Sequence, residues 1–174
     1  MLHESDRLAH EIAEQLTRLG MRIVFAESCT GGLLSATLAR IPGISNVHCG
    51  SAVVYRLDTK TQWLGIEKTI LVNPGAVSEP VARLMAEGVL KRTPEASIAA
   101  SITGHLGPNA PAHQDGLIYV GIAIRDKTCR VLEHRLPKLG EFTGSGEVER
   151  LRRLEAAAEF VLVNVAETLR PHLS

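Results

Sequence analysis

Residues 22–32 of this 174-residue chain read RIVFAESCTGG, and this stretch decides the fold class. Arg22 to Ala26 is a short apolar run with β-branched and aromatic side chains, which predicts a buried strand. A polar, glycine-rich segment follows at once, and Leu33 to Ile41 then has the pattern of a helix that ends before Pro42-Gly43. A strand that runs through a glycine-rich turn into a helix is the start of an α/β unit.

The rest of the chain alternates between similar apolar runs and amphipathic segments. Before the quoted stretch, residues 5–19 predict a helix with Ser5 as its N-cap and Gly20 as its stop. After it, we expect strands at 50–55, 97–102, 117–125 and 129–136, and helices at 60–64, 79–92 and 147–169. Asp126-Lys127 joins the last two strands too closely for them to be parallel. The expected fold is therefore a single α/β domain over residues 1–174, with three α/β/α layers and a mixed, mostly parallel sheet.

The composition argues against several classes of protein. Nineteen Lys and Arg balance nineteen Asp and Glu, and only six residues are aromatic. Nucleic-acid-binding domains are usually strongly basic and often stack bases on aromatic rings, so no nucleic-acid partner is expected. A polybasic membrane-surface protein is excluded by the same charge balance, and no run approaches the roughly eighteen apolar residues of a membrane span.

The cysteines and the first residues indicate the compartment. Cys29, Cys49 and Cys129 are odd in number, widely spaced and without C-x-x-C spacing, which favours reduced thiols over a disulfide frame or a zinc site. Cys29 itself is interpreted as a small buried thiol. The first eighteen residues carry charges and do not resemble a signal peptide. We expect a cytoplasmic protein.

Polar or glycine-rich segments follow three of the expected strands, at residues 27–32, 55–60 and 103–108. If these strands are parallel, the three segments emerge at the carboxyl edge of the sheet, where open α/β sheets bind ligands. The sequence therefore places a candidate site at this edge, provided that the topology is the expected one.

The first two segments each have a functional and a structural interpretation. The turn from Ser28 to Gly32 can hold an anion or oxyanion on free N–H groups, or it is an ordinary N-cap serine with a tight turn. Lys60, close to Arg56, can be a base with a lowered pKa, or it is a solvated lysine at a helix start.

Later polar residues allow weaker hypotheses. His105, His113 and Asp115 could be imagined as metal ligands, but no cysteine or helical H-x-x-x-H spacing supports them, so no metal is expected. Loop solvation is the favoured role of both histidines. The last helix carries three arginines, which are interpreted as a solvated face paired with Glu147, Glu149 and Glu155: Arg150, Arg152 and Arg153. One of them could instead reach an anionic substrate.

Four strings stand in a fixed order along the chain: A-E-S-C-T-G-G at 26–32, Val54-Tyr55 with Lys60, G-A-V-S-E at 75–79, and S-I-T-G with Gly107-Pro108 at 101–108. Together they resemble the C-terminal domain of the CinA family. The resemblance extends from about residue 5 to residue 170, and the family contains nicotinamide-nucleotide amidohydrolases (NMN deamidases). Longer members have a separate N-terminal domain, so the chain is similar to the stand-alone form.

This resemblance implies an amidase that converts nicotinamide mononucleotide to nicotinate mononucleotide and ammonia, with no metal or other cofactor. Carried over by motif, Ser28 is the nucleophile, Lys60 is its general base and Tyr55 assists. Substrate binding, including an oxyanion site in the first turn, is assigned to five further residues: Thr30, Gly31, Gly32, Thr103 and Gly104. A homodimer is expected from the resemblance and from the frequency of dimers among soluble proteins.

The chain departs from the family pattern at three places. His105-Leu106 fills the middle of T-G-I-A-G-P, Asn109 to Asp115 replaces a glycine-rich stretch with K-P-V-G, and Gly144-Ser145-Gly146 stands where G-D-R is common. These positions would grip a phosphate or a ring. Two alternatives therefore stay open: an amidase on a related amide, and a non-catalytic nucleotide-binding or regulatory member. Whether Arg150 or Arg152 replaces the missing arginine is not assigned by the sequence.

Overall fold

The structure is a computed structural model that describes residues 3–137 and 146–173. Of the three departures from the family pattern, Gly144 and Ser145 lie outside the described residues. Among the described helices, none has a stretch long and apolar enough to cross a membrane.

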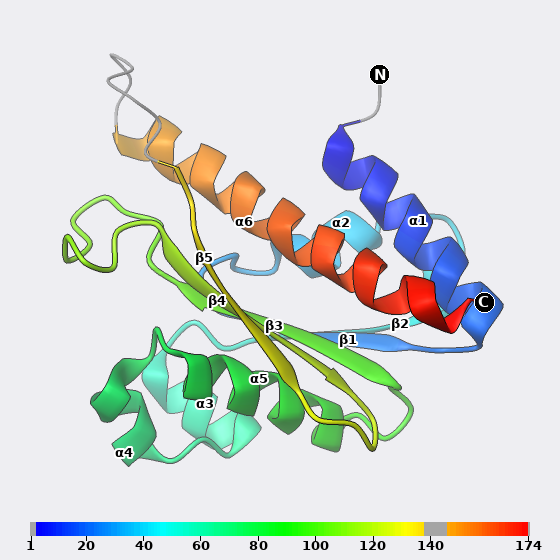
Figure 1. Cartoon of the computed structure of the whole chain (residues 1–174), viewed down its shortest axis with the longest axis horizontal. Coiled ribbons are helices and arrows are strands. Elements are labelled where there is room, and N and C mark those ends of the chain that lie inside the picture. Colours follow the sequence, from blue (N-terminus) through cyan, green and yellow to red (C-terminus); the bar gives the residue numbers. More distant parts are fainter. Residues whose placement is uncertain (1–2, 138–145, 174) are drawn as a thin grey trace.

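A five-stranded sheet in the order β2-β1-β3-β4-β5 forms the middle layer (Figure 1). Its strands are β1 (Ile23–Glu27), β2 (His48–Val53), β3 (Ile98–Gly104), β4 (Leu117–Ile124) and β5 (Arg130–Arg135). β1 pairs in parallel with both β2 and β3, whereas β4 is antiparallel to both β3 and β5. β4 alone therefore runs against the other four strands, which confirms the mixed, mostly parallel sheet.

Helices cover both faces of the sheet, so the three expected layers are confirmed (Figure 1). One face carries α1 (Glu4–Leu19), α2 (Leu33–Leu38) and α6 (Gly146–Leu169), and the other carries α3 (Leu57–Leu64), α4 (Lys68–Ile70) and α5 (Glu79–Arg92). Short helical turns at Ile44–Asn46 (η1), Leu71–Gly75 (η2) and Arg170–His172 (η3) complete the described elements.

The alternation of side chains along the strands divides the core into two clusters. Ile23 and Phe25 of β1 pack with the apolar faces of α1 and α6, whereas Val24 and Ala26 pack on the side of α5. This follows from the two-residue period of a strand, which sends successive side chains to opposite faces. Both faces of β1 are buried, as expected for a strand that lies between two parallel neighbours.

Two of the predicted helix starts were wrong. His3, and not Ser5, is the N-cap of α1, because the helix already begins at Glu4, while Gly20 ends it in the left-handed conformation as predicted. α3 begins at Leu57, three residues before the predicted start, and the Lys60 N–H already donates to Arg56 O. Lys60 therefore lies within the helix, one turn from its start.

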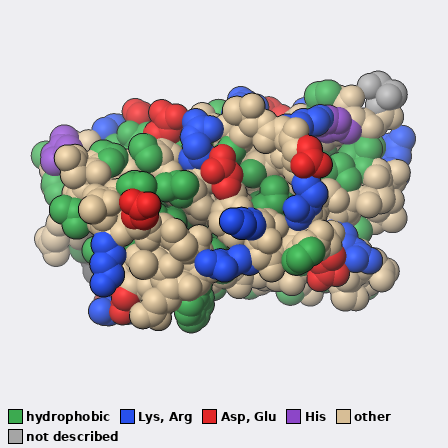
Figure 2. Space-filling view, turned by 90° about the horizontal axis from the view of Figure 1, so that it is seen from below, with side chains coloured by type: hydrophobic (Ala, Val, Ile, Leu, Met, Phe, Trp, Pro, Cys, Tyr) green, Lys and Arg blue, Asp and Glu red, His purple; other side chains and the backbone are tan. Residues whose placement is uncertain are grey.

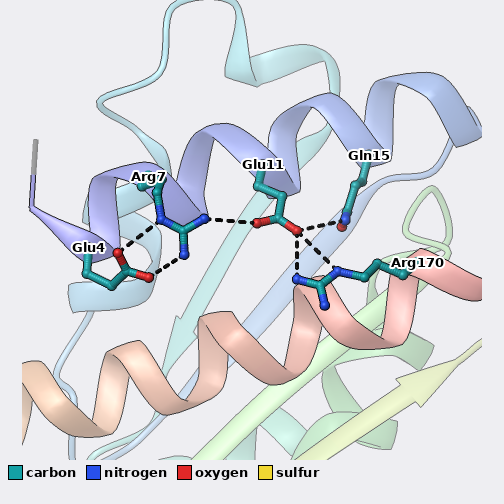
Figure 3. Close-up of polar contacts among 5 residues, drawn as sticks. All are labelled: Glu4, Arg7, Glu11, Gln15 and Arg170. Atoms are coloured by element: carbon teal, nitrogen blue, oxygen red, sulfur yellow. Dashed lines mark hydrogen bonds and ion pairs between the residues drawn. The ribbon is translucent and has the colours of Figure 1, made fainter.

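An exposed chain of ion pairs joins α1 to η3, the turn that directly follows α6 (Figure 3). Arg7 lies between Glu4 and Glu11, and Glu11 also accepts hydrogen bonds from Gln15 and Arg170. Exposed pairs of this kind contribute little stability, so the buried leucine and valine side chains between the two helices do most of the docking.

The neutral net charge is also visible on the surface. Basic and acidic side chains are interspersed over the face formed by α3, α4 and α5, without a continuous field of one sign (Figure 2). Any attraction for a charged ligand must therefore come from a local arrangement of side chains.

Candidate active site

The carboxyl ends of β1, β2 and β3 open into one pocket of about 510 Å³. Because these strands are parallel, the segments that follow them meet there, as the sequence predicted. Residues from all three segments line the pocket, and the remaining walls come from residues 72–77, from the loop up to Gln114 and from Arg150 of α6. This volume lies within the usual range for small-molecule sites.

Ser28 stands directly after β1 and lines this pocket with only 8% of its surface exposed. Its N–H donates to Ile102 O at 3.1 Å, which continues the pairing of β1 with β3. On the other side, the Val54 N–H donates to Glu27 O at 2.8 Å. The backbone around Ser28 is thus held from both neighbouring strands.

Lys60 reaches Ser28 from the first turn of α3. Its side chain is 1% exposed, and Nζ lies 2.8 Å from Ser28 Oγ, 2.6 Å from Val54 O and 3.5 Å from Tyr55 O. The interpretation of Lys60 as a solvated lysine is therefore wrong. Burial in this position disfavours the charged ammonium and lowers the pKa of Lys60 from 10.5 to about 8.

The three neighbours of Lys60 Nζ suit a neutral amine. A neutral amine has two N–H donors and one lone pair, whereas the ammonium has three donors and no acceptor. The carbonyl oxygens of Val54 and Tyr55 can only accept, and the Ser28 hydroxyl can also donate. In its neutral form, Lys60 can donate to both carbonyls and accept the Ser28 proton on its lone pair.

Glu27 organises the turn that carries Ser28. Its carboxylate is completely buried and accepts five hydrogen bonds of 2.8–3.1 Å, from the hydroxyls of Thr30 and Ser51 and from the N–H groups of Gly32, Leu34 and Ser35. The protein's own carboxylate thus occupies the start of α2, the turn for which the sequence allowed either an anion site or an ordinary N-cap serine. This role of Glu27 was not predicted, although a glutamate directly before a glycine-rich helix start was its signal.

Three of the predicted substrate-binding residues do not line the pocket: Thr30, Gly31 and Gly32. The Gly31 N–H donates to Ser28 O, and the Gly32 N–H donates to Glu27. Their positive φ values of 62° and 106° explain why glycines stand at these two positions. In this geometry the two glycines shape the turn, and their N–H groups do not point to a ligand.

Thr103 and Gly104 do line the pocket, at the end of β3. The Thr103 hydroxyl donates to Ala76 O at 2.8 Å and so holds the loop between η2 and α5 against the pocket. A Cβ at Gly104 would lie 2.5 Å from Ile118 Cγ2 and 2.8 Å from Leu117 O. The close packing of strand β4 therefore explains the glycine at this position.

Tyr55 is 56% exposed at the mouth of the pocket, where it meets Arg150. Its phenol oxygen accepts from Arg150 Nη2 at 2.8 Å, and Arg150 Nη1 donates to Gly107 O at 2.6 Å. The described contact between Tyr55 and Lys60 is made by the backbone carbonyl oxygen of Tyr55 and not by its phenol. The sequence left Arg150 unassigned, and the structure places it in the wall of the pocket.

Arg153, one helical turn after Arg150, corrects the prediction of a solvated arginine face. It is only 2% exposed, and its guanidinium bonds both carboxylate oxygens of Asp115, at 2.6 and 3.1 Å, as well as Glu149 at 3.0 Å. Of the predicted glutamate partners, Glu149 is the one that Arg153 contacts. Arg153 therefore ties the loop before β4 to α6, and Asp115 is engaged in this ion pair.

The remaining hypotheses concern Cys29 and metals. Cys29 is buried, as predicted, and burial raises the pKa of its thiol to about 12. Among the residues that the structure describes, no group of three or more His, Cys, Asp or Glu side chains is arranged to hold a metal ion. The described lining of the pocket contains the cations Lys60 and Arg150 but no aspartate or glutamate.

Comparisons with known proteins agree with this architecture. The family model of the CinA C-terminal domain matches residues 5–141. A CinA-like protein of Gloeobacter violaceus is 41% identical over 135 residues, which are 76% of this chain and 31% of that protein. A protein of Caldicellulosiruptor saccharolyticus is 36% identical over 168 residues, which are 95% of this chain and 38% of that protein. The chain thus spans less than two fifths of the length of these relatives.

Solved structures resemble the whole fold. The competence/damage inducible protein CihA from Agrobacterium tumefaciens has a TM-score of 0.80 and 32% identity, covering 95% of this chain and 97% of its own. The competence or damage-inducible protein from Enterobacter asburiae has a TM-score of 0.83 and 26% identity, covering 97% of this chain and 99% of its own. Together with the family match, these likenesses show that the chain belongs to the CinA C-terminal domain family.

Proposed function

We propose that this chain hydrolyses the carboxamide of nicotinamide mononucleotide to nicotinate mononucleotide and ammonia, with Ser28 as nucleophile and Lys60 as general base. The observation that carries this proposal is the buried contact of 2.8 Å between Lys60 Nζ and Ser28 Oγ at the edge of the pocket. A serine is a weak nucleophile unless an adjacent base removes its proton.

In the first step, Ser28 Oγ attacks the amide carbon while its proton moves to the neutral amine of Lys60. The carbonyl oxygen becomes an oxyanion in a tetrahedral intermediate. When the intermediate collapses, the C–N bond breaks, and Lys60 returns the proton to the leaving nitrogen, which departs as ammonia. The product of this step is an ester between Ser28 and the nicotinoyl group, and Lys60 is neutral again.

In the second step, water hydrolyses this ester. Lys60 takes a proton from the water as its oxygen attacks the ester carbon. The bond to Ser28 Oγ then breaks, and Lys60 gives the proton back to Oγ. The acid product and the free serine are released, so one water is consumed for each ammonia formed.

The oxyanion needs donors close to Ser28. The N–H groups of Gly31 and Gly32 are used inside the turn, whereas no described oxygen accepts from the Cys29 N–H. Within this proposal, the backbone N–H of Cys29, a residue that lines the pocket, stabilises the oxyanion. Preorganised backbone donors of this kind are among the largest contributions to acyl transfer.

The pocket itself supports an anionic substrate. Its described lining carries Lys60 and Arg150 and no acidic side chain, so a mononucleotide meets attraction and no opposing carboxylate there. Polar side chains of His105, Asn109 and Gln114 also line the pocket, at and after the positions that depart from the family pattern. They are available for hydrogen bonds to the sugar or the ring.

The test is ammonia release from nicotinamide mononucleotide by the wild type and by Ser28→Ala and Lys60→Ala. We expect each variant to lose activity by about 10³-fold or more, because neither member of the pair works alone. Ser45→Ala and Lys91→Ala are the matched controls, since both side chains are exposed and lie outside the pocket lining. They should keep wild-type activity.

Three results would change the proposal. Full activity in Ser28→Ala would end the mechanism. Ammonia release from other amides but not from nicotinamide mononucleotide would make the chain an amidase on a related amide. Stabilisation by the nucleotide in a thermal shift assay, without any ammonia, would make it a non-catalytic nucleotide-binding member.

A further inference from the structure

The positive charges of the pocket are not equally available to a ligand. Lys60 is enclosed by Ser28 and two backbone carbonyls. Arg153 lies behind the pocket and is neutralised by two carboxylates, from Asp115 and Glu149. Arg150 lines the pocket, and its described partners are both neutral: the Tyr55 hydroxyl and Gly107 O.

Arg150 therefore carries a charge that no described carboxylate neutralises. It is half-buried, and the pocket that it lines has no described acidic side chain. Its two hydrogen bonds use two of the five N–H groups of a guanidinium, and the other three donate to no described acceptor. A planar guanidinium with free donors matches the oxygens of a phosphate group.

The position of Arg150 places this charge close to the reacting serine. Burial raises the pKa of the thiol of Cys29, the residue next to Ser28, and the positive charges of Lys60 and Arg150 both oppose this rise. Its two hydrogen bonds also fix the guanidinium between the Tyr55 segment and the loop at Gly107. A ligand that presents its amide to Ser28 can thus present an anionic group to Arg150 from within the same pocket.

The other anion site that the sequence suggested is already filled. The N–H groups at the start of α2 bond to the carboxylate of Glu27, so a phosphate cannot use them without displacing a buried anion. Among the described residues that line the pocket, this leaves Arg150 as the cation that is not engaged with Ser28.

We infer that Arg150 forms a binding subsite for the phosphate monoester of the substrate and so makes the enzyme select a nucleotide over the corresponding nucleoside. This inference rests on the proposed function, and it adds which group of the substrate is recognised and by which residue. Arg150 is a specificity-determining residue in this inference, while Ser28 and Lys60 carry out the reaction.

The experiment compares nicotinamide mononucleotide with nicotinamide riboside, which has the same amide but no phosphate. In Arg150→Gln we expect kcat/KM for the mononucleotide to fall roughly 10- to 100-fold, mainly through KM, because a charge-assisted contact is lost. The value for the riboside should stay within about threefold of the wild type. Arg150→Lys should recover part of the preference, since it keeps the charge but loses the planar fork.

Two controls separate recognition of the phosphate from support of the loop. Arg152→Gln removes an exposed arginine two residues away on the same helix and should leave both substrates unchanged. Tyr55→Phe removes the hydroxyl that Arg150 bonds but keeps the charge, so the preference for the mononucleotide should remain whatever the overall rate. An equal loss for both substrates in Arg150→Gln would overturn the inference and leave Arg150 a positioning residue for Gly107.

A binding measurement keeps the inference testable if the proposed function fails. In a Ser28→Ala background, the mononucleotide should raise the melting temperature more than the riboside does. Adding Arg150→Gln should remove that difference. If the wild type releases no ammonia from either compound, the proposed function is wrong, and this assay still decides whether Arg150 binds the phosphate. If the mononucleotide and the riboside raise the melting temperature of Ser28→Ala equally, the phosphate is not recognised, and the inference of a phosphate subsite is wrong.

Discussion

Two walls of the pocket are built by different means. The strand-end wall consists of Ser28 and Lys60 with Glu27 behind them, and strand pairing and buried hydrogen bonds hold it in place. The α6 wall consists of Arg150 and the loop up to Gln114 with Arg153 behind them, and it is joined to the rest of the site mainly by side-chain contacts. In the first wall the charges are enclosed, and in the second wall one charge remains available.

This difference corresponds to two physical requirements. A nucleophile and its base must stay within hydrogen-bonding distance, and backbone pairing with two neighbouring strands provides that rigidity. A site that recognises a ligand's charge needs a cation that can exchange one neutral partner for an anion, which the Arg150 side chain provides.

Replacing Glu27 should cause the largest loss of stability. Glu27→Ala leaves two buried and three partly buried donors without their acceptor, and we expect a loss of about 3–5 kcal/mol in the free energy of unfolding, since each orphaned group is costly. Urea denaturation measures it, and Glu87→Ala on the exposed side of α5 is the control, which should change stability by less than about 0.5 kcal/mol. A loss equal to that of the control would show that the turn does not depend on Glu27.

Breaking the ion pair in the α6 wall should cost less. Arg153→Gln removes the partner of Asp115 and Glu149, but both carboxylates are partly exposed and can regain water, so we expect a loss of about 2 kcal/mol. Urea denaturation measures this loss in the free energy of unfolding, with the exposed Arg152→Gln as the control variant. Because the loop before β4 loses its tie to α6, we also expect this substitution to raise KM more than it lowers kcat. If kcat alone falls, the α6 wall acts in the chemical step, and the division between the walls is wrong.

The pH profile tests the enclosed charge of the strand-end wall. Because burial lowers the pKa of Lys60 to about 8, the neutral base should be a minor form at pH 7 and the major form at pH 9. We therefore expect kcat/KM to rise about tenfold between these two values, with its midpoint near 8 and a plateau above 9. A midpoint near 10 would mean that Lys60 is not desolvated during turnover, and a flat profile would remove it as the base.

The smallest effect is expected for Tyr55→Phe, which touches both walls. The phenol is largely exposed, and its described contact is with Arg150, so losing it should cost at most about 1 kcal/mol, seen as a few-fold change in KM. Steady-state kinetics on nicotinamide mononucleotide measures this. A loss in kcat of a hundredfold or more would instead place the phenol in the reaction, as the family resemblance implied for Tyr55.

The two walls also differ in how far the sequence predicted them. The pattern RIVFAESCTGG predicted the strand, turn and helix, and the family resemblance pointed to Ser28 and Lys60. The burial of Lys60 could not be predicted, because it depends on α3 folding over the ends of β1 and β2. Four of the five donors to Glu27 lie within eight residues of it, so this role had a local signal that the sequence interpretation did not use. Arg153 had no such signal, because its main partner Asp115 is 38 residues away.

The sequence by itself predicted the layers and a mixed, mostly parallel sheet, and it placed the polar segments at one edge on the condition that their strands are parallel. These follow from hydrophobic periodicity and turn chemistry, which act over a few residues. Only the tertiary structure decided which charges are enclosed and which stay available. Ser28 meets Lys60 across 32 residues of chain, and Tyr55 meets Arg150 across 95. Contacts between side chains so far apart in sequence leave no periodic trace, because they depend on how whole helices lie against the sheet.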